Sequence, residues 1–483
     1  MNWIPVLKII YDLIIVVVCL RIIYDTRTTS RTLAYLMLTI FFPVVGAIVY
    51  FSFGINYRKR KLYSKKIFQN EELFNRIKND IYSSSQKAWR ESGPEIKQNK
   101  ELAFLLLKDN LSPLSDNNRV KLLQNGEHKF PEVLKALRGA KHHIHIEYYI
   151  FEDDGIGNQI KDILIQKAQE GVKVRFIYDD FGSRSIRKKL VPQLREAGVE
   201  AYPFHKVFFI LLANRLNYRN HRKIIVIDGC IGFVGGINVS DRYINDSRDP
   251  KKLFWRDTHL YIEGSGVFYL QYLFLCDWNF CSPAKLHPVK QFFCYPENSL
   301  GDTIVQIAAS GPDSDTPTIL YSLLQAINLA QKEILITTPY LIPGESLLDS
   351  LIVAAMSGIQ VKLLIPGNSD ALFVDVASRS YFEDLMDAGV EIYLYKKGFV
   401  HAKTLVTDSN VSIIGTANMD YRSLELNFEV NAMVYDSIIA NELRNTFFED
   451  LKDATKIDKS TWSKRPLYMQ LIEKTARLVS PLL

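Results

Sequence analysis

Two histidine-centred motifs of the same composition occur at one constant offset along the chain. Each reads His-x-Lys, four mostly apolar residues and Asp, and a glycine-containing turn and an asparagine follow at the same distance in both copies. The two sets are His221, Lys223, Asp228 and Asn238, and His401, Lys403, Asp408 and Asn418. Because chance rarely repeats so many residue types twice at one offset, these residues are the first candidates for a catalytic site.

The chemistry that suits these side chains is that of a phosphate diester. Residues 224–227 and 404–407 read as short strands rich in β-branched side chains. Since strand side chains alternate, the His and Lys of each copy share a face, and we expect Asp228 and Asp408 to brace the motifs. Two histidines can supply a nucleophile toward phosphorus and a proton for the leaving oxygen. The lysines and asparagines would stabilise the charge on the non-bridging oxygens.

The doubled pattern resembles the signature of the phospholipase D superfamily, and the likeness covers most of the chain beyond residue 120. It implies that His221 attacks the phosphate and that His401 protonates the departing oxygen. It also implies that an acid downstream of each motif accepts the Nδ1 proton of a catalytic histidine. The matching residues are Asp257 and Glu429.

One position departs from the superfamily pattern. Gly236 stands where a serine is usual, whereas Thr416 keeps a hydroxyl at the equivalent place in the second copy. We therefore expect the contribution of this hydroxyl to phosphate binding to be one-sided.

The elements that must position the motifs follow an α/β rhythm that occurs twice. Predicted strands are 143–151, 172–178 and 199–202, with helices at 157–170 and 190–197; the second half repeats this order with strands 333–340, 359–365 and 390–395 and helices 346–356 and 381–388. Such alternation predicts an α/β fold with largely parallel sheets. We expect two pseudo-symmetric phospholipase D-like lobes that pack face to face and bring both motifs into one site.

The N-terminal stretch reads as a membrane anchor. Residues 4–23 and 33–53 are predicted to be transmembrane helices, since spanning a bilayer takes roughly 20 apolar residues. Residues 57–66 follow with six cations and no acid, which places the remainder in the cytoplasm. This basic run either binds anionic headgroups or acts only as a stop-transfer flank. Because the excess positive charge lies here and not on the catalytic part, a nuclease is disfavoured.

Cysteine and histidine usage bears on compartment and cofactors. The five cysteines are scattered, which favours reduced thiols in a cytoplasmic setting. His142, His143, His145 and Glu147 form a cluster for which a metal site is the alternative interpretation. We predict no metal and no other cofactor, because the second repeat lacks this cluster and no nucleotide-binding motif is present.

Within the superfamily the chain resembles the bacterial cardiolipin synthases. The likeness rests on residues 33–54 with the basic run after them, on the strand ends at 147–150 and 338–340, and on the C-terminal residues 480–483. It implies phosphatidyl transfer between two phosphatidylglycerol molecules through a phosphatidyl-histidine intermediate, at a bacterial cell membrane and without a nucleic-acid partner. The alternatives are a membrane phospholipase D that hydrolyses phospholipid, a phosphodiester nuclease and a non-catalytic scaffold.

The expected domain order follows from these readings. It is a membrane anchor at 1–54, a basic segment with a helical connector at 55–117, a first lobe at 118–298, a second lobe at 299–452 and an amphipathic tail at 453–483. The apolar stretch at 207–212, just before the first motif, is expected either to dip into the bilayer beside the site or to fill the space between the lobes.

Overall fold

The arrangement of the chain is known from a computed structural model. It describes residues 3–26, 29–51, 81–83, 85–90, 93–110, 112–204, 219–245, 252–293, 300–312, 314 and 316–480. The predicted basic run at 57–66 and the apolar stretch at 207–212 lie outside these residues.

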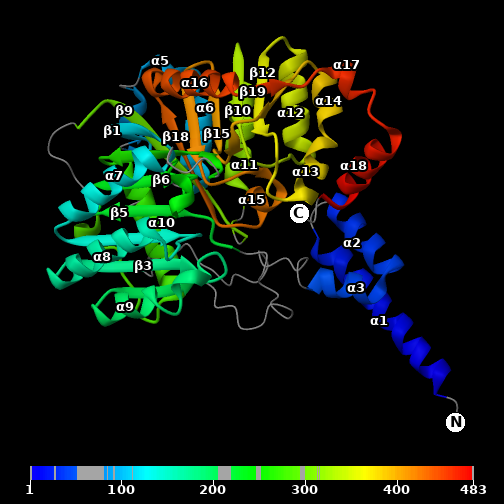
Figure 1. Cartoon of the computed structure of the whole chain (residues 1–483), viewed down its shortest axis with the longest axis horizontal. Coiled ribbons are helices and arrows are strands. Elements are labelled where there is room, and N and C mark those ends of the chain that lie inside the picture. Colours follow the sequence, from blue (N-terminus) through cyan, green and yellow to red (C-terminus); the bar gives the residue numbers. More distant parts are fainter. Residues whose placement is uncertain are drawn as a thin grey trace.

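In the described part of the chain, fifteen strands form one continuous sheet that carries the duplication (Figure 1). The first half runs β1 (Ser115–Gln124), β8 (Thr258–Glu263), β6 (Ile231–Gly235), β5 (Lys223–Ile227), β2 (His143–Tyr148), β3 (Lys173–Asp179) and β4 (Glu200–Phe204). The second half runs β9 (Thr303–Ser310), β18 (Glu429–Tyr435), β16 (Val411–Gly415), β15 (Thr404–Thr407), β10 (Glu333–Thr337), β12 (Gln360–Pro366), β13 (Glu391–Tyr395) and β19 (Ala454–Lys456). Outward from the β1–β9 pair, the seven strands of the first half match the first seven of the second, and β19 is an additional edge strand. This order confirms the predicted duplication.

The prediction of a largely parallel sheet is wrong, because most neighbouring strands in the sheet are antiparallel. Only β2, β3 and β4, and their counterparts β10, β12 and β13, pair in parallel. The motif strands β5 and β15 pair antiparallel with both of their neighbours. Each is joined to the next strand by a tight turn, and a connection that short permits only antiparallel pairing.

Helices cover the sheet in two sets. The outer set is α7 (Asn125–Gly139), α8 (Gly155–Gln169) and α9 (Leu190–Glu196) in the first half, and α11 (Thr318–Leu329), α12 (Glu345–Met356) and α14 (Phe382–Asp387) in the second. The inner set is α10 (Val267–Cys281) and α16 (Ser437–Lys452). Aspartates cap two of these helices: Asp154 accepts the N–H of Gly157 on α8, and Asp436 accepts two N–H groups on α16.

The two lobes share a core in addition to the sheet. Strands β6 and β8 pack against β16 and β18, and one apolar cluster contains residues of both halves. The lobes therefore meet face to face, and the ends of both motif strands open toward the same region.

The predicted second anchor helix is interrupted. Residues 29–49 form α2 (Thr29–Phe41) and α3 (Pro43–Val49), which follow α1 (Ile4–Asp25). Phe42 between them has φ −134° and ψ 70°. Pro43 lacks an N–H, and its ring disfavours a helical conformation at the residue before it. Among the residues placed by the structure, no helix combines the length and apolar character that crossing a membrane requires.

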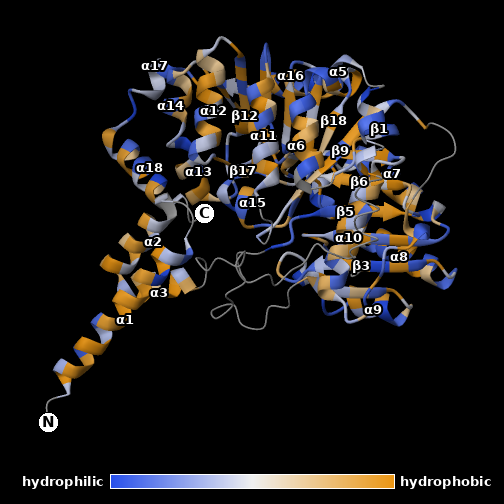
Figure 2. Ribbon diagram, turned by 180° about the vertical axis from the view of Figure 1, so that it is seen from behind, coloured by the Kyte–Doolittle hydropathy of each residue, from blue (hydrophilic) through white to orange (hydrophobic). Residues whose placement is uncertain are grey.

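The anchor helices nevertheless form a small packed unit. Val18 and Ile22 of α1 meet Tyr35 of α2 and Tyr50 beyond α3 in a buried cluster. At Gly46 the two helices approach so closely that a Cβ atom would lie 2.4 Å from the Cα atom of Thr39. Most other large apolar side chains of these helices are exposed. Figure 2 shows these helices coloured largely as hydrophobic.

One cysteine corrects the expectation of reduced thiols. Cys230, in the turn between β5 and β6, is disulfide-bonded, whereas Cys19, Cys276 and Cys281 are free. Spacing in the sequence could not reveal this pairing, because it depends on which segments the fold brings together.

Candidate active site

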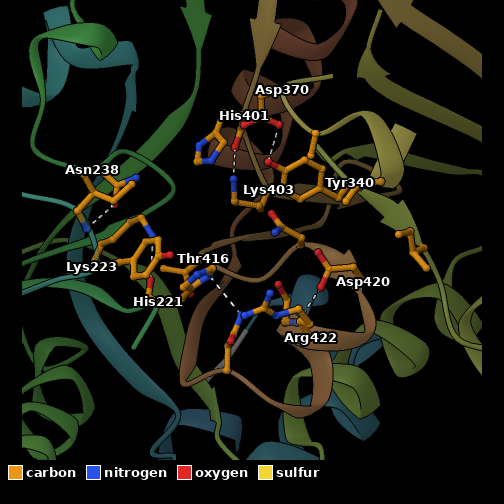
Figure 3. Close-up of a pocket in the computed structure, with 18 of the residues that line it drawn as sticks. His221, Lys223, Asn238, Tyr340, Asp370, His401, Lys403, Thr416, Asp420 and Arg422 are labelled. Atoms are coloured by element: carbon orange, nitrogen blue, oxygen red, sulfur yellow. Dashed lines mark hydrogen bonds between the residues drawn. The ribbon is translucent and has the colours of Figure 1, made fainter. Parts of the chain in front are cut away.

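Both motifs open into one cavity of about 520 Å³ between the lobes (Figure 3). The predicted site residues that line it are His221, Lys223, Asn238, His401, Lys403, Thr416 and Asn418. Each half contributes a histidine, a lysine and an asparagine, so the two motifs supply the same three residue types to one pocket.

The start of each motif is fixed by the opposite lobe. The N–H of His221 donates to the carbonyl of Phe428 (2.9 Å), and the N–H of His401 donates to the carbonyl of Arg256 (2.7 Å). Within each motif the lysine ammonium donates to the carbonyl of its own histidine, at 2.8 Å from Lys223 in the first copy. The backbone of each motif and the cation beside it are therefore held in place before any substrate binds.

The two orienting acids are exchanged between the lobes. His221 Nδ1 lies 3.0 Å from Oε1 of Glu429, which belongs to the second lobe. His401 Nδ1 lies 2.7 Å from Oδ2 of Asp257, which belongs to the first. Both carboxylates are fully buried. An acceptor at Nδ1 keeps the proton there and presents Nε2 to the pocket, so each histidine depends on the lobe that does not contain it.

The supports of the two acids differ. Thr416 lines the pocket, but its Oγ1 donates a hydrogen bond to Glu429 Oε2 at 2.5 Å. The hydroxyl therefore holds the carboxylate of Glu429 in place. On the other side, Asp257 Oδ1 accepts the N–H of Thr258 at 2.7 Å. A Cβ atom at Gly236 would lie 2.2 Å from Asp257 Oδ1, so the glycine leaves the space that this carboxylate occupies.

The motif aspartates lie away from the pocket. Asp228 and Asp408 both have φ 52° at the turn after their strand. Asp228 accepts the N–H groups of three successive residues, 141–143, at 2.7–2.9 Å. Asp408 does the same for residues 331–333. Neither carboxylate lines the cavity, and each ties its motif strand to the start of the neighbouring strand.

Residues of the histidine cluster on β2 form hydrogen bonds with other side chains of the protein. Nε2 of His143 and Nδ1 of His145 lie 3.2 and 3.0 Å from Oε1 of Gln271 on α10. Glu147 accepts a hydrogen bond from Asn220, and His142 is exposed at the start of the strand. This face of β2 is therefore turned into the core and away from the pocket.

Burial lowers the pKa values of three basic groups in the pocket. Desolvation lowers the pKa of Lys403 to about 7 and that of Lys223 to about 8, although nearby carboxylates oppose it. Desolvation and the neighbouring Lys403 lower the pKa of His401 to about 4. In the empty site His401 is therefore neutral near pH 7, and Lys403 is near its midpoint.

These shifts predict a difference between two pH profiles. An ammonium is the form that binds a phosphate anion, so kcat/KM should fall as the pH rises through about 7 to 8. A bound phosphodiester favours the charged lysines and raises their pKa values, so the alkaline fall of kcat should lie at higher pH. Steady-state kinetics across this pH range would measure both profiles. If kcat and kcat/KM fell at the same alkaline pH, the proposed role of the lysines in binding phosphate would be contradicted. Lys403→Arg, which does not deprotonate, should flatten the fall in kcat/KM.

Sequence reasoning missed the other polar groups of the pocket. Tyr340, which follows β10, donates from its hydroxyl to Oδ1 of Asp370 at 2.7 Å. Asp420 is buried and accepts the N–H of Ser423 at 2.7 Å. Arg242 and Arg422 also line the cavity. Tyr340 lies between strands, and Arg242, Asp420 and Arg422 lie in very short elements: the 3₁₀ helix Asp241–Tyr243, β17 (Met419–Asp420) and α15 (Tyr421–Glu425). Elements this short leave no periodic pattern in the sequence, and of these four residues only Tyr340 was noted, as part of a strand end.

Comparisons with known proteins agree with this geometry. A family model described as "Cardiolipin synthase, PLD-like domain" matches residues 133–251 and 323–451, and one described as "Phospholipase_D-nuclease N-terminal" matches residues 12–54. A cardiolipin synthase of Alkalihalophilus pseudofirmus is 41% identical over 100% of this chain and 95% of its own length. Cardiolipin synthase 2 of Bacillus anthracis is 44% identical over 96% of this chain and 88% of its own.

A solved structure shows the same fold at low identity. The crystal structure of phosphatidylserine synthase from Haemophilus influenzae superposes with a TM-score of 0.59 and 14% identity. The match covers 79% of this chain and 100% of the other.

Proposed function

The chain belongs to the cardiolipin synthase family, a group of phosphatidyltransferases of the phospholipase D superfamily, and on that premise we propose that it uses phosphatidylglycerol through the paired motifs. It synthesises cardiolipin by moving a phosphatidyl group from one lipid to the hydroxyl of another. The observation that carries the proposed assignment of residues is the meeting of two His–Lys pairs in one pocket, each histidine with a buried acid at Nδ1.

In the first half-reaction, Nε2 of His221 attacks the phosphorus of a phosphatidylglycerol. The bond from phosphorus to the headgroup oxygen breaks, and His401 gives that oxygen a proton, so glycerol leaves. Lys223 and Lys403, with Asn238 and Asn418, stabilise the charge on the non-bridging oxygens. Glu429 offsets the positive charge that forms on the imidazole of His221.

In the second half-reaction, His401 accepts the proton of a headgroup hydroxyl of the second phosphatidylglycerol. The hydroxyl oxygen bonds to phosphorus, and the electron pair of the phosphorus–nitrogen bond returns to His221. The product is cardiolipin. Water at the same position would give phosphatidic acid, the product of the hydrolase alternative.

The remaining pocket residues favour a lipid alcohol as acceptor. Carboxylates oppose a phosphate but accept hydrogen bonds from hydroxyl groups, which suits Asp370 and Asp420 to the glycerol headgroup. The acceptor also carries a phosphate of its own. Arg242 and Arg422, which lie outside the motifs, are guanidinium groups suited to that second anion. Hydrolysis would need neither feature.

The family assignment implies membrane association. Within it we propose the finer arrangement predicted from the sequence: residues 1–54 anchor the chain in a bacterial cell membrane through two spanning segments, and the lobes lie in the cytoplasm. The basic run at 57–66 supports this orientation.

The product decides between transferase and hydrolase. Purified enzyme given phosphatidylglycerol should form cardiolipin and free glycerol in equal amounts without added nucleotide or divalent metal, measured by thin-layer chromatography and a glycerol assay. Phosphatidic acid as the sole product would move the assignment to the hydrolase.

An acceptor with a single headgroup hydroxyl serves as control for the proposed glycerol site. With labelled phosphatidylglycerol as donor, phosphatidyl-1,3-propanediol should accept the phosphatidyl group about tenfold less well than phosphatidylglycerol, since the carboxylates of the wild-type site lose one hydroxyl donor. Asp370→Asn should reduce this difference between the two acceptors and leave the rate with phosphatidyl-1,3-propanediol nearly unchanged. An unchanged preference would remove Asp370 from headgroup recognition.

A further inference from the structure

The C-terminal helix α18 (Leu467–Val479) presents its apolar side chains to the outside. Leu467, Tyr468, Leu471, Ile472 and Leu478 are 82, 61, 67, 55 and 63% exposed. Their spacing places them along one side of a helix. A helix on a protein surface in water normally turns such a stripe toward the core, so its outward orientation calls for an apolar partner.

The opposite side of α18 faces the protein, where Ala476 is buried in the apolar core of the second lobe and polar residues surround it. Glu473 is buried and bonds to Arg465 at 2.5 Å. Arg477 donates to Asp384 at 2.6 Å. Ser480, just beyond the helix, lies 2.9 Å from the hydroxyl of Tyr381. The contacts of Arg477 and Ser480 with the second lobe fix which side of the helix faces outward, so the exposed stripe is not the result of an undocked tail.

A second element extends this surface toward the pocket. Helix α13 (Leu372–Arg379) packs against α18, and its Leu372 and Phe373 are 80 and 47% exposed. Val374 and the preceding Ala371 line the catalytic cavity, as does Val49 of α3. The apolar surface is therefore continuous with the pocket wall. Figures 1 and 2 show α13 and α18 next to the anchor helices.

We propose that the exposed apolar side chains of α13 and α18 form a lipid-contact face that lies on the bilayer. This face consists of Leu372, Phe373, Leu467, Tyr468, Leu471, Ile472 and Leu478. A bilayer is the occupant that the position favours, because the face adjoins the anchor helices, whose outward side chains are also apolar. A helix whose apolar side is buried at the headgroup boundary would lie in the plane of the membrane.

This placement gives the lipid a route to the site. With α13 on the bilayer, the cavity wall formed by Ala371, Val374 and Val49 meets the membrane surface. A substrate could then bring its phosphate to the motifs while its acyl chains stay in the bilayer. The inference rests on the proposed function in that the substrate is a membrane lipid.

Photocrosslinking tests the contact without requiring turnover. Full-length enzyme with a benzophenone amino acid in place of Leu471 is reconstituted in vesicles of phosphatidylglycerol and phosphatidylethanolamine and irradiated. Mass spectrometry should find lipid adducts at this position. Ile438, 77% exposed at the start of α16, is the matched control and should give none. Crosslinks to a second copy of the chain, or no lipid adduct, would overturn the proposal.

Kinetics test what the contact does. Leu467→Glu with Leu471→Glu should lower turnover of phosphatidylglycerol in vesicles by about tenfold or more, because the carboxylates oppose insertion at the membrane interface. Turnover of a short-chain, monomeric phosphatidylglycerol should stay within about twofold, and Ile438→Glu should change neither. Equal losses on both substrates would mean that α18 supports the fold and not the contact. Absence of cardiolipin from the wild type would instead refute the proposed function and leave the crosslinking result interpretable.

Discussion

His221→Ala should lower cardiolipin formation by at least about 10⁴-fold, because it removes the imidazole proposed to bond to phosphorus and leaves one histidine in the pocket for two roles. Wild-type enzyme quenched in mid-turnover and digested under mildly alkaline conditions should carry a labile phosphatidyl group on the His221 peptide. Mass spectrometry would locate it. His142→Ala, which changes an exposed histidine outside the pocket, should leave both the rate and the adduct unchanged.

The acid role of His401 is tested in the same experiment. His401→Ala should block adduct formation from phosphatidylglycerol, whose glycerol leaves poorly without a proton. A lipid phosphodiester with a nitrophenol leaving group needs no acid and should still form the adduct. Because the pKa of His401 is about 4 in the empty site, this role also requires that the bound phosphate raise it. An adduct on the His401 peptide would reverse the two roles, and no adduct would mean direct displacement by the second lipid.

The second large expected effect on the rate comes from changing an acid that orients a histidine of the other lobe. Asp257→Asn should lower the rate with phosphatidylglycerol by about 10³-fold, although Asp257 lies in the first lobe and the histidine that it orients lies in the second. With the nitrophenol substrate, the rate of adduct formation should fall only slightly, because His401 is then not needed as an acid. Each adduct formed releases one nitrophenol, so stopped-flow detection of nitrophenol would measure this rate.

Glu429→Gln should behave in the opposite way. It disturbs the nucleophile His221, so adduct formation should fall with both substrates. Glu263→Gln removes a carboxyl of the first lobe that pairs with Arg119 at the surface, and it should change neither rate. If Asp257→Asn instead slowed adduct formation with the nitrophenol substrate as strongly as Glu429→Gln, the acids would not act through the histidines that they contact.

The sequence predicted those parts of the fold that follow from local pattern. The alternating elements of both halves appear within a few residues of the predicted positions, for example β3 (Lys173–Asp179) for 172–178. Helix α10 was missed because its side chains are apolar on nearly every side, which leaves no periodicity to detect. The break at Phe42 could have been predicted, since Pro43 marks it in the sequence.

The site shows where sequence reasoning ends. Asp257 and Glu429 could be named as acids from their positions, but spacing cannot say which histidine each one serves, because that depends on how the lobes pack. The sequence also cannot predict which side of α18 faces the protein, because this too depends on how the helix packs on the lobe. Its amphipathic pattern predicts two unlike sides, and the contacts of Arg477 and Ser480 with the second lobe show which side points outward.

The exchanged acids also bear on how such a chain could have arisen. In a two-fold symmetric dimer, each subunit contributes the same residue to the equivalent site of its neighbour. A single-lobe ancestor with this arrangement would have been inert as a monomer and active only as a homodimer. Gene fusion would then have made the partnership permanent. Once both halves lay on one polypeptide they no longer had to remain identical, and the glycine at 236 opposite the threonine at 416 is the kind of divergence that this freedom allows.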